Sequence, residues 1–549
     1  MFRIVSIIPF PRDSEENEQD RVLISLITLP PSLPSLPPPS ESLLLVSERT
    51  NYLIYELEDT TTLAAHDFDV DTRTGFMPPQ QPSLRLPSDW EPWEDILDRA
   101  IASKLQLGCK VRLTEEERET SERWRARVRE LSILPTTELK KSEVLLRRAH
   151  LVLAWLLHFY IHTLPTNSPI VIPAPITLPL LQVSRDLQLP PVITYSDDVL
   201  YNWRFTNGQE MDEYGNDILP SPSNISAHTL FTGTSDEAEF YLSSARMELK
   251  GVEALELMRS MMDEMFVGDD IATRRITEYL HELAEIIKEL GEMLMKVKEG
   301  CKPEVFYHEI RPWFRGEDSS SEGGGKWVFE GLEMDESLSR PTELSGPSAG
   351  QSALVHALDV FLGVDQFSHS ATSPSPSASS TDAGPSGAPQ SQNGSAKQPR
   401  STFLKRMQGY MPRHHRAFLN HLANTPRPLR DFVLTKFQEG GASGEEQKSG
   451  GDSDGQKVLE AYNAAVQALK VFRDKHMIIV ALYIIGPARR TPAGSVPSTG
   501  SSGTQASKEK EAKREPLKGT GGTDLVKFLK SVRDQTKDAL LLSDEVSRA

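Results

Sequence analysis

Apolar residues recur at helical spacing through the stretch VLEAYNAAVQALKVFRDKHMIIVALYIIGP, and no other feature constrains the fold of this chain more strongly. The intervals alternate between three and four residues, which places these residues on one face of a helix. The residues that share this face are Leu459, Tyr462, Val466, Leu469, Val480 and Tyr483. The sequence therefore predicts a long helix with one buried face.

His476 falls in the same register, so its imidazole points into the protein. A buried neutral imidazole presents one nitrogen lone pair, which haem iron requires on its proximal side. The alternative is a core histidine that hydrogen-bonds a backbone carbonyl. From periodicity alone we favour the alternative, because a single histidine carries no ligand spacing that could be checked.

A second strongly periodic segment spans residues 271–297, and Gly300 is placed to end it as a cap. Its apolar positions follow a four-three alternation and comprise Ile276, Leu280, Leu283, Ile287, Leu290, Leu294 and Val297. This spacing allows a coiled-coil dimer, but we favour a core helix, because three heptads in a helical domain are commonly one buried face. Strand-type alternation is scarce, so the predicted fold class is all-α.

Proline, glycine and serine divide the chain into folded and unfolded parts. With 39 prolines and 34 glycines, the chain has a smaller folded core than its 549 residues suggest. We expect a poorly packed extension at 1–66, a smaller N-terminal helical domain with a linker at 67–228, and a large helical domain at 229–549. Within the last we expect solvated low-complexity inserts at about 366–401, 440–456 and 489–518. The segment QLPPVITYSDDVLYNWRF is read as a linking segment.

Charge, cysteine usage and hydropathy exclude several classes. The net charge of −18 argues against a nucleic-acid partner, which would need a positive surface. The two cysteines, Cys109 and Cys301, lack CxxC spacing and indicate a reducing compartment. The apolar runs LVLAWLL and MIIVALYII are shorter than the ~20 residues that span a bilayer. Because the N-terminus has no signal-peptide pattern, we expect a cytoplasmic protein without a membrane span.

Arg311 lies among aromatic residues in EVFYHEIRPWFRG, a setting in which a guanidinium usually needs a carboxylate partner. That partner is either an acidic residue of the protein, which we favour, or a ligand. Phe306 can reach the same pocket and either pack or stack on a flat substrate. Pro312 disfavours helical geometry at Arg311.

Two further charged residues lie near the His476 helix in the predicted fold. Asp359 has apolar neighbours in VHALDVFLG, and Arg473 precedes His476 by one turn. Arg473 is a candidate to pair with Asp359 or with a haem propionate, and either contact would brace the helix. The histidines of YMPRHHRAFLNHL point to different sides of a helix, which argues against a metal cluster.

Several segments together resemble the indoleamine 2,3-dioxygenases, in what looks like a fungal member of that family. They are LQLPPVITYSDDVLYNW, EFYLSS, VFYHEIRPWFRG, SGPSAGQS, LDVFLG, YMPRHHRAFLNHL, RPLRDFVL, the His476 helix and KGTGGTDLVKFLKSVR. These segments run from about Phe68 to the C-terminus, and the low-complexity inserts fall between them.

The resemblance implies roles for individual residues and reverses the preference that periodicity gave for His476, which becomes the proximal haem ligand. Arg311 becomes the binder of the substrate carboxylate, and Phe306 packs against the indole. The distal-pocket and loop positions that the resemblance implies are Tyr160, Phe240, Tyr241, Ser244, Ser348, Ala349, Gly350 and, in a mobile segment, Thr520.

The implied function is a haem dioxygenase that inserts both atoms of dioxygen into the indole C2–C3 bond of L-tryptophan. The product is N-formyl-L-kynurenine, on the kynurenine pathway toward NAD. We expect haem b, ferrous in the active state, with an unidentified reductant, a monomeric protein and no strong acid or base in the pocket. Two alternatives are a non-enzymatic haem protein that binds dioxygen reversibly and a haem-free helical interaction module.

Overall fold

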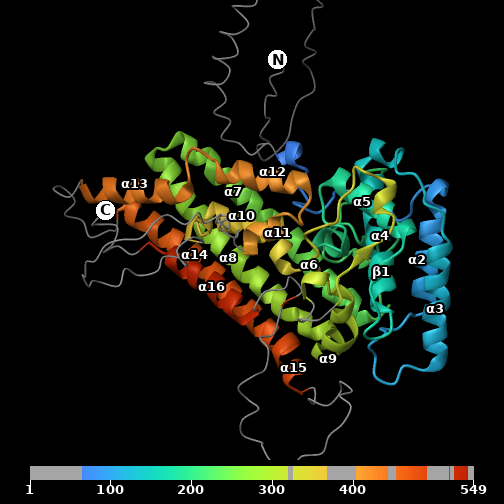
Figure 1. Cartoon of the computed structure of the whole chain (residues 1–549). Helices are drawn as coiled ribbons and strands as arrows, with labels where there is room; N and C mark the ends of the chain where they lie inside the picture. The colour runs from blue at the N-terminus through green and yellow to red at the C-terminus, as the bar shows by residue number, and fades with distance from the viewer. Residues whose placement is uncertain are drawn as a thin grey trace, which may run out of the picture. The chain divides into compact units, whose positions relative to one another are not determined.

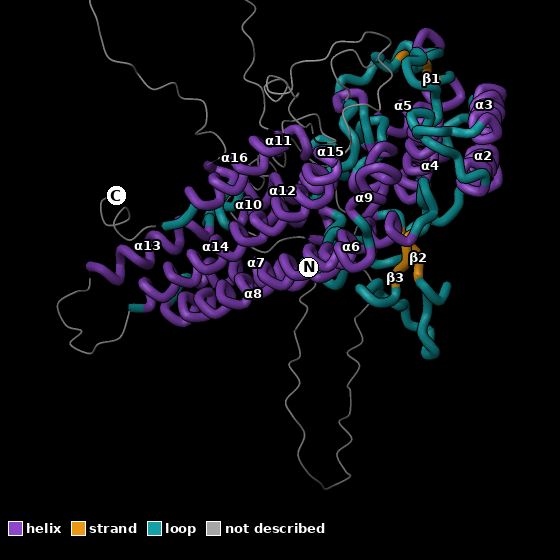
Figure 2. Tube along the Cα trace, turned by 90° about the horizontal axis from the view of Figure 1, so that it is seen from below, coloured by secondary structure: helices purple, strands orange, loops and turns teal. Residues whose placement is uncertain are grey.

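The computed structural model describes residues 65–319, 325–367, 403–442, 453–490, 519 and 525–541. All of them belong to one compact unit, Thr61–Ala549. Helices dominate this part of the chain, which confirms the all-α prediction (Figures 1 and 2). Most of the predicted extension and inserts lie outside the described residues, and the division at residue 228 stays a prediction.

The N-terminal helices surround one very apolar helix, α4, which has fifteen buried residues along its length. Their bounds are α2 Glu91–Ala102, α3 Glu115–Glu130, α4 Glu143–His162 and α5 Ala174–Leu187. Side-chain caps fix two of the starts, since Thr114 forms a reciprocal capping box with Glu117 and Ser142 accepts from a backbone amide. These four helices gather at one end of the described unit (Figure 1).

By length and composition α4 is able to cross a membrane, which the short run LVLAWLL did not suggest. In the structure, however, 83% of its apolar window is buried by neighbouring parts of the chain, as in the core helix of a soluble domain. A buried ion pair between Arg148 on α4 and Glu94 on α2, 2.6 Å apart, joins it to its neighbour.

The remaining helices continue from residue 235 and pack mainly around α8 and α14. Their bounds are α6 Ser235–Lys250, α7 Val252–Val267, α8 Asp270–Gly300, α9 Pro303–Val305, α10 Ala353–Phe361, α11 Phe403–Gln408, α12 Arg413–Ala423, α13 Leu429–Ala442, α14 Asp454–Val480, α15 Gly486–Arg490 and α16 Leu525–Asp538. Helices α8 and α14 lie side by side along most of their length (Figures 1 and 2).

The buried face of α8 confirms that this segment is a core helix. Its residues Ile276, Leu280, Leu283 and Ile287 are fully buried in the same cluster as residues of α7, α10 and α14. The seam that would allow a coiled-coil dimer is therefore already covered within one chain. The predicted bounds, 271–297, differ from the observed ones by only a few residues.

In the part of the chain that the structure describes, the strands form two small sheets. Strands β1 (Val171–Ile172) and β4 (Val328–Phe329) pair in parallel, and β2 (Trp203–Phe205) and β3 (Ile225–Ala227) pair antiparallel. Among the described residues, three five-residue π-helical turns interrupt the α-helical pattern, at Ser196–Leu200, Phe306–Ile310 and Ala481–Ile485. Such turns often occur at functional sites, and each of these three contributes residues to the site described next.

Candidate functional site

Helix α14 carries His476 near its C-terminal end. The helix begins at the Ser453 cap and buries the predicted stripe, with Tyr462, Val466 and Leu469 fully buried. The side chain of His476 is enclosed by the protein but partly accessible, because it lines both of the cavities described next. Among the described residues, neither ring nitrogen has a hydrogen-bond partner, so the core-histidine alternative lacks the carbonyl that it requires.

Two cavities meet at His476. Together with their openings to solvent, they enclose about 1060 and 1310 Å³. Nine residues line both cavities, among them His476, Tyr195, Ser244, Ala349 and Gly350. We call the smaller one the Asp359 cavity and the larger one the Arg311 cavity, after a charged residue that lines each.

The surroundings of His476 fit a haem ligand. Burial, together with the nearby charge of Arg473, lowers the pKa of the His476 imidazole to about 4. The ring is therefore neutral at physiological pH and holds a lone pair toward a large, mainly apolar space. A haem needs this combination of one neutral imidazole donor and an apolar enclosure.

The Arg311 cavity brings together most of the predicted substrate-binding residues. Arg311, Phe306, Phe240, Ser244, Ser348, Ala349 and Gly350 all line it. The rings of Phe240 and Phe306 lie 4.5 Å apart, and Tyr483 packs 5.7 Å from Phe306. These rings form an aromatic wall suited to a flat ligand.

Arg311 is 6% exposed, and its guanidinium lies 5.6 Å from the Tyr307 ring. Burial and the charge of Arg315 lower its pKa to about 10, so it remains a cation at neutral pH. Pro312 was expected to disfavour helical geometry at Arg311, but Arg311 is helical, with φ −53° and ψ −35°. Arg311 begins a 3-10 turn directly after the π-turn, and Pro312 occupies an early helical position, which tolerates proline.

The structure does not bring Tyr160 and Tyr241 to either cavity. Tyr160 lies in the core around α4, where its hydroxyl accepts a hydrogen bond from Arg129 Nε at 2.8 Å. Tyr241 follows Phe240 on α6 and points to another side of that helix, where its hydroxyl donates to Glu237 at 3.0 Å. Both predictions of a pocket position are corrected by these contacts.

Thr520 lies outside the described residues. Its neighbour Gly519 is buried and lines the Arg311 cavity, together with Leu525, Phe528 and Leu529 at the start of α16. The C-terminal segment therefore contributes to this cavity on at least one side of Thr520.

Arg473 pairs with Asp359, the first of the two partners that the sequence predicted for it. Both side chains are less than 10% exposed, and both line the Asp359 cavity. The guanidinium also donates to the Thr536 hydroxyl on α16. These contacts tie α10, α14 and α16 together one turn before His476.

Sequence reasoning identified Asp359 but missed a second carboxyl group at the same cavity. Glu248 lines the Asp359 cavity, and its Oε1 accepts hydrogen bonds from Tyr195 at 2.9 Å and from Ser352 at 2.7 Å. Burial raises the pKa of Glu248 to about 7. In the sequence, Glu248 could have been noticed because it falls on the helical face of α6 that its apolar residues occupy.

The segment read as a linker is also part of the site. Its residues Tyr195, Asp198 and Val199 line the Arg311 cavity from a buried π-turn. The paired prolines suggested a connection, but two adjacent aspartates flanked by apolar and aromatic residues were the better signal.

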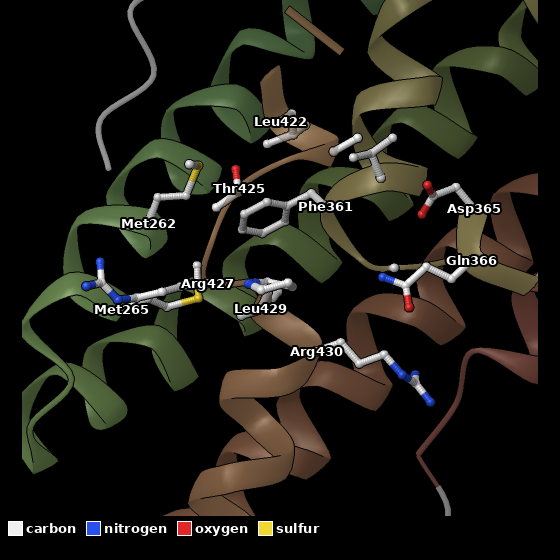
Figure 3. Close-up of a pocket in the computed structure, with 14 residues that line it drawn as sticks. Met262, Met265, Phe361, Asp365, Gln366, Leu422, Thr425, Arg427, Leu429 and Arg430 are labelled. Carbon is white, nitrogen blue, oxygen red and sulfur yellow. The ribbon is translucent and has the colours of Figure 1, made fainter. Parts of the chain in front are cut away.

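The described residues contain no group of three or more histidine, cysteine, aspartate or glutamate side chains that could hold a metal ion. A third cavity, of about 460 Å³, lies among α7, α10, α12 and α13 (Figure 3). Met262 and Met265 border one side of it, and Asp365 and Gln366 border the other. None of the predicted site residues lines this cavity.

Comparison with known proteins adds an independent finding. The family model described as indoleamine 2,3-dioxygenase matches residues 64–539. Indoleamine 2,3-dioxygenase from Saccharomyces cerevisiae is 32% identical over 474 residues, which cover 84% of this chain and 90% of that protein. Indoleamine 2,3-dioxygenase 1 from Mus musculus is 28% identical, covering 86% and 95%. A 6-hydroxytryptophan 2,3-dioxygenase from Fusarium equiseti is 27% identical, covering 89% and 100%.

Proposed function

The chain belongs to the indoleamine 2,3-dioxygenase family and is a haem-dependent dioxygenase of tryptophan-type substrates; from this premise we propose that its substrate is L-tryptophan. The reaction adds both atoms of one dioxygen molecule across the indole C2–C3 bond, which breaks, and yields N-formyl-L-kynurenine without a leaving group. The observation that carries the proposal is the Arg311 cavity, where a buried cation and an aromatic wall adjoin His476.

Arg311 suits the carboxylate of an amino acid. Its guanidinium is charged and almost fully buried, so a carboxylate that enters the cavity can accept two parallel hydrogen bonds in a site of low dielectric. Phe306 and Phe240 then offer ring faces to the indole. Fixing both ends of the substrate confines the reacting bond to one place in the cavity.

His476 is the residue that would hold the haem. When bound, the haem supplies the iron chemistry that activates dioxygen. The neutral imidazole of His476 is available for coordination, and the Asp359–Arg473 pair fixes the helix that carries it. The apolar lining keeps bulk water away from the reacting groups.

The relative from Fusarium equiseti is named for 6-hydroxytryptophan, so the ring substituents of the substrate are the part of this proposal that most needs a test. The experiment uses the haem-loaded, reduced full chain with L-tryptophan under ¹⁸O₂. The proposal expects N-formylkynurenine that carries two ¹⁸O atoms, detected by mass spectrometry. Turnover of a hydroxytryptophan with none of L-tryptophan would refute the proposed substrate, and a single ¹⁸O atom would refute the proposed reaction.

We further propose that the enzyme is a cytoplasmic monomer, reduced by a separate partner, that feeds the kynurenine pathway toward NAD. The free thiols of Cys109 and Cys301 support a reducing compartment. The burial of the α8 seam supports a monomer. Cell fractionation and light scattering of the purified protein test these two points.

A further inference from the structure

Asp198 is a buried carboxyl group at the Arg311 cavity that the proposed reaction does not use. It is 3% exposed and lies in the π-turn Ser196–Leu200, beside Tyr195 and Val199, which line the same cavity. Its Oδ1 atom has no hydrogen-bond partner among the described residues. A buried polar atom without a partner lowers stability, so a ligand in the adjoining cavity that hydrogen-bonds this carboxyl group would be stabilised.

The neighbouring aspartate shows how a structural carboxylate in this turn is satisfied. Asp197 accepts from the backbone amide and the hydroxyl of Thr194, each at 2.8 Å, and lies 2.9 Å from His150 Nδ1. It borders a different, small cavity. Asp197 thus stabilises the turn, whereas Asp198 has no comparable set of contacts.

The surroundings of Asp198 favour its neutral form. Burial, together with the negative charge of Asp197, raises the pKa of the Asp198 carboxyl well above its usual value, and Glu237 adds to this effect. A protonated carboxyl group offers one O–H donor and one carbonyl acceptor. It can therefore pair with a hydroxyl group, which also donates and accepts, without burying a net charge.

Helix α6 links Asp198 with the predicted ends of the substrate site. It packs against the π-turn that carries Asp198 and against the π-turn that precedes Arg311, and its residues Phe240 and Ser244 line the cavity. Asp198 and Arg311 line the same cavity, so a substrate whose carboxylate binds Arg311 can place its indole ring between these two residues.

We propose that Asp198 is a specificity-determining residue whose carboxyl group hydrogen-bonds a hydroxyl group on the six-membered ring of the substrate's indole. The inference rests on the proposed function, because it requires Arg311 to bind the amino-acid end. It implies that the enzyme discriminates in favour of a ring-hydroxylated tryptophan over a tryptophan with an apolar substituent of the same size.

The test compares hydroxyl with methyl substituents at each position of the six-membered ring, using the haem-loaded full chain. The wild type is expected to prefer hydroxyl over methyl at one position by about ten-fold in kcat/KM, the size of one buried hydrogen bond. Asp198→Leu is expected to abolish this preference, and Asp198→Asn, which still donates and accepts, to retain most of it. Asp89→Leu, at an exposed aspartate, is the matched control.

Equilibrium dialysis of the same substrates under anaerobic conditions gives a readout independent of turnover, and the same ratio of dissociation constants is expected. A wild type that prefers methyl at every position, or a folded Asp198→Leu variant that keeps the hydroxyl preference, would overturn the inference. If Asp198→Leu does not fold, the wild-type preference and Asp198→Asn decide. Failure of the proposed function can be told apart from failure of this inference. If the proposed function is wrong, the wild type does not turn over L-tryptophan, whatever its preference between hydroxyl and methyl substituents.

Discussion

Replacing Arg311 with methionine removes the buried cation of the Arg311 cavity and keeps an unbranched apolar chain in its place. Arg311 is 6% exposed, so water cannot take over its contacts with a carboxylate. We expect the variant to fold and bind haem, because the Asp359–Arg473 pair and His476 are provided by α10 and α14.

The expected magnitude follows from the contact that is lost. A guanidinium and a carboxylate form two charge-assisted hydrogen bonds, and each contributes about 1.5–3 kcal/mol. At the lower end the pair contributes about 3 kcal/mol, which corresponds to a decrease in kcat/KM of ~150-fold. Arg311→Lys keeps the charge but loses the planar fork, so an intermediate decrease is expected.

The assay measures kcat/KM for L-tryptophan and for tryptamine, which lacks the carboxylate. The wild type should favour L-tryptophan strongly, and Arg311→Met should remove this preference by slowing L-tryptophan turnover alone. Arg315→Met, at an exposed neighbouring arginine, serves as the control. Equal losses for both substrates in Arg311→Met would refute the assignment, because they would show that Arg311 acts on the fold or the haem.

Three further changes test the structure around the site. Asp359→Ala leaves the buried Arg473 guanidinium without its carboxylate, so the free energy of unfolding, measured in urea, should fall by about 3–5 kcal/mol. Adding Arg473→Met in a double variant should restore part of this loss. A loss below ~0.5 kcal/mol in Asp359→Ala would contradict the reasoning. Burial lowers the pKa of His415 to about 3, so as the pH drops from about 6.5 the unfolded chain binds a proton before the folded chain does, and stability falls. In His415→Phe, the midpoint of urea unfolding should therefore depend less on pH across this window. An unchanged dependence of the midpoint on pH would contradict the assignment. A Cβ at Gly346 would overlap the Phe314 carbonyl oxygen, so Gly346→Ala should lower stability by about 1–3 kcal/mol. Thermal unfolding measures this loss, and kinetics should show a raised KM. A variant as stable as the wild type would argue against this close approach.

Periodicity predicted those parts of the fold in which a single buried face determines the structure. The α14 stripe and the α8 seam are buried as their spacing indicated, because packing against neighbouring helices removes these apolar faces from water. The π-turn at Ser196–Leu200 could not be predicted in this way, since its burial depends on α4 and α6, which are distant in sequence.

The candidate site was predicted where the resemblance supplied an aligned motif. Arg311, Phe306 and His476 all reach the cavities. Tyr160 does not, because the face of α4 that carries it packs into the N-terminal core. Asp198 was missed because its importance depends on what its neighbour Asp197 bonds, and no pattern in one sequence reports that contact.

The most direct test of the account is the Soret absorption of haem-reconstituted protein with alanine in place of His476. His356→Gln is the matched control, because His356 also borders the Asp359 cavity but hydrogen-bonds the Gly350 carbonyl at 2.9 Å. We expect His476→Ala to lose the Soret band of the wild type and to regain it on addition of imidazole, while His356→Gln keeps it. A normal Soret band in His476→Ala without imidazole would contradict the assignment of His476 as the haem ligand.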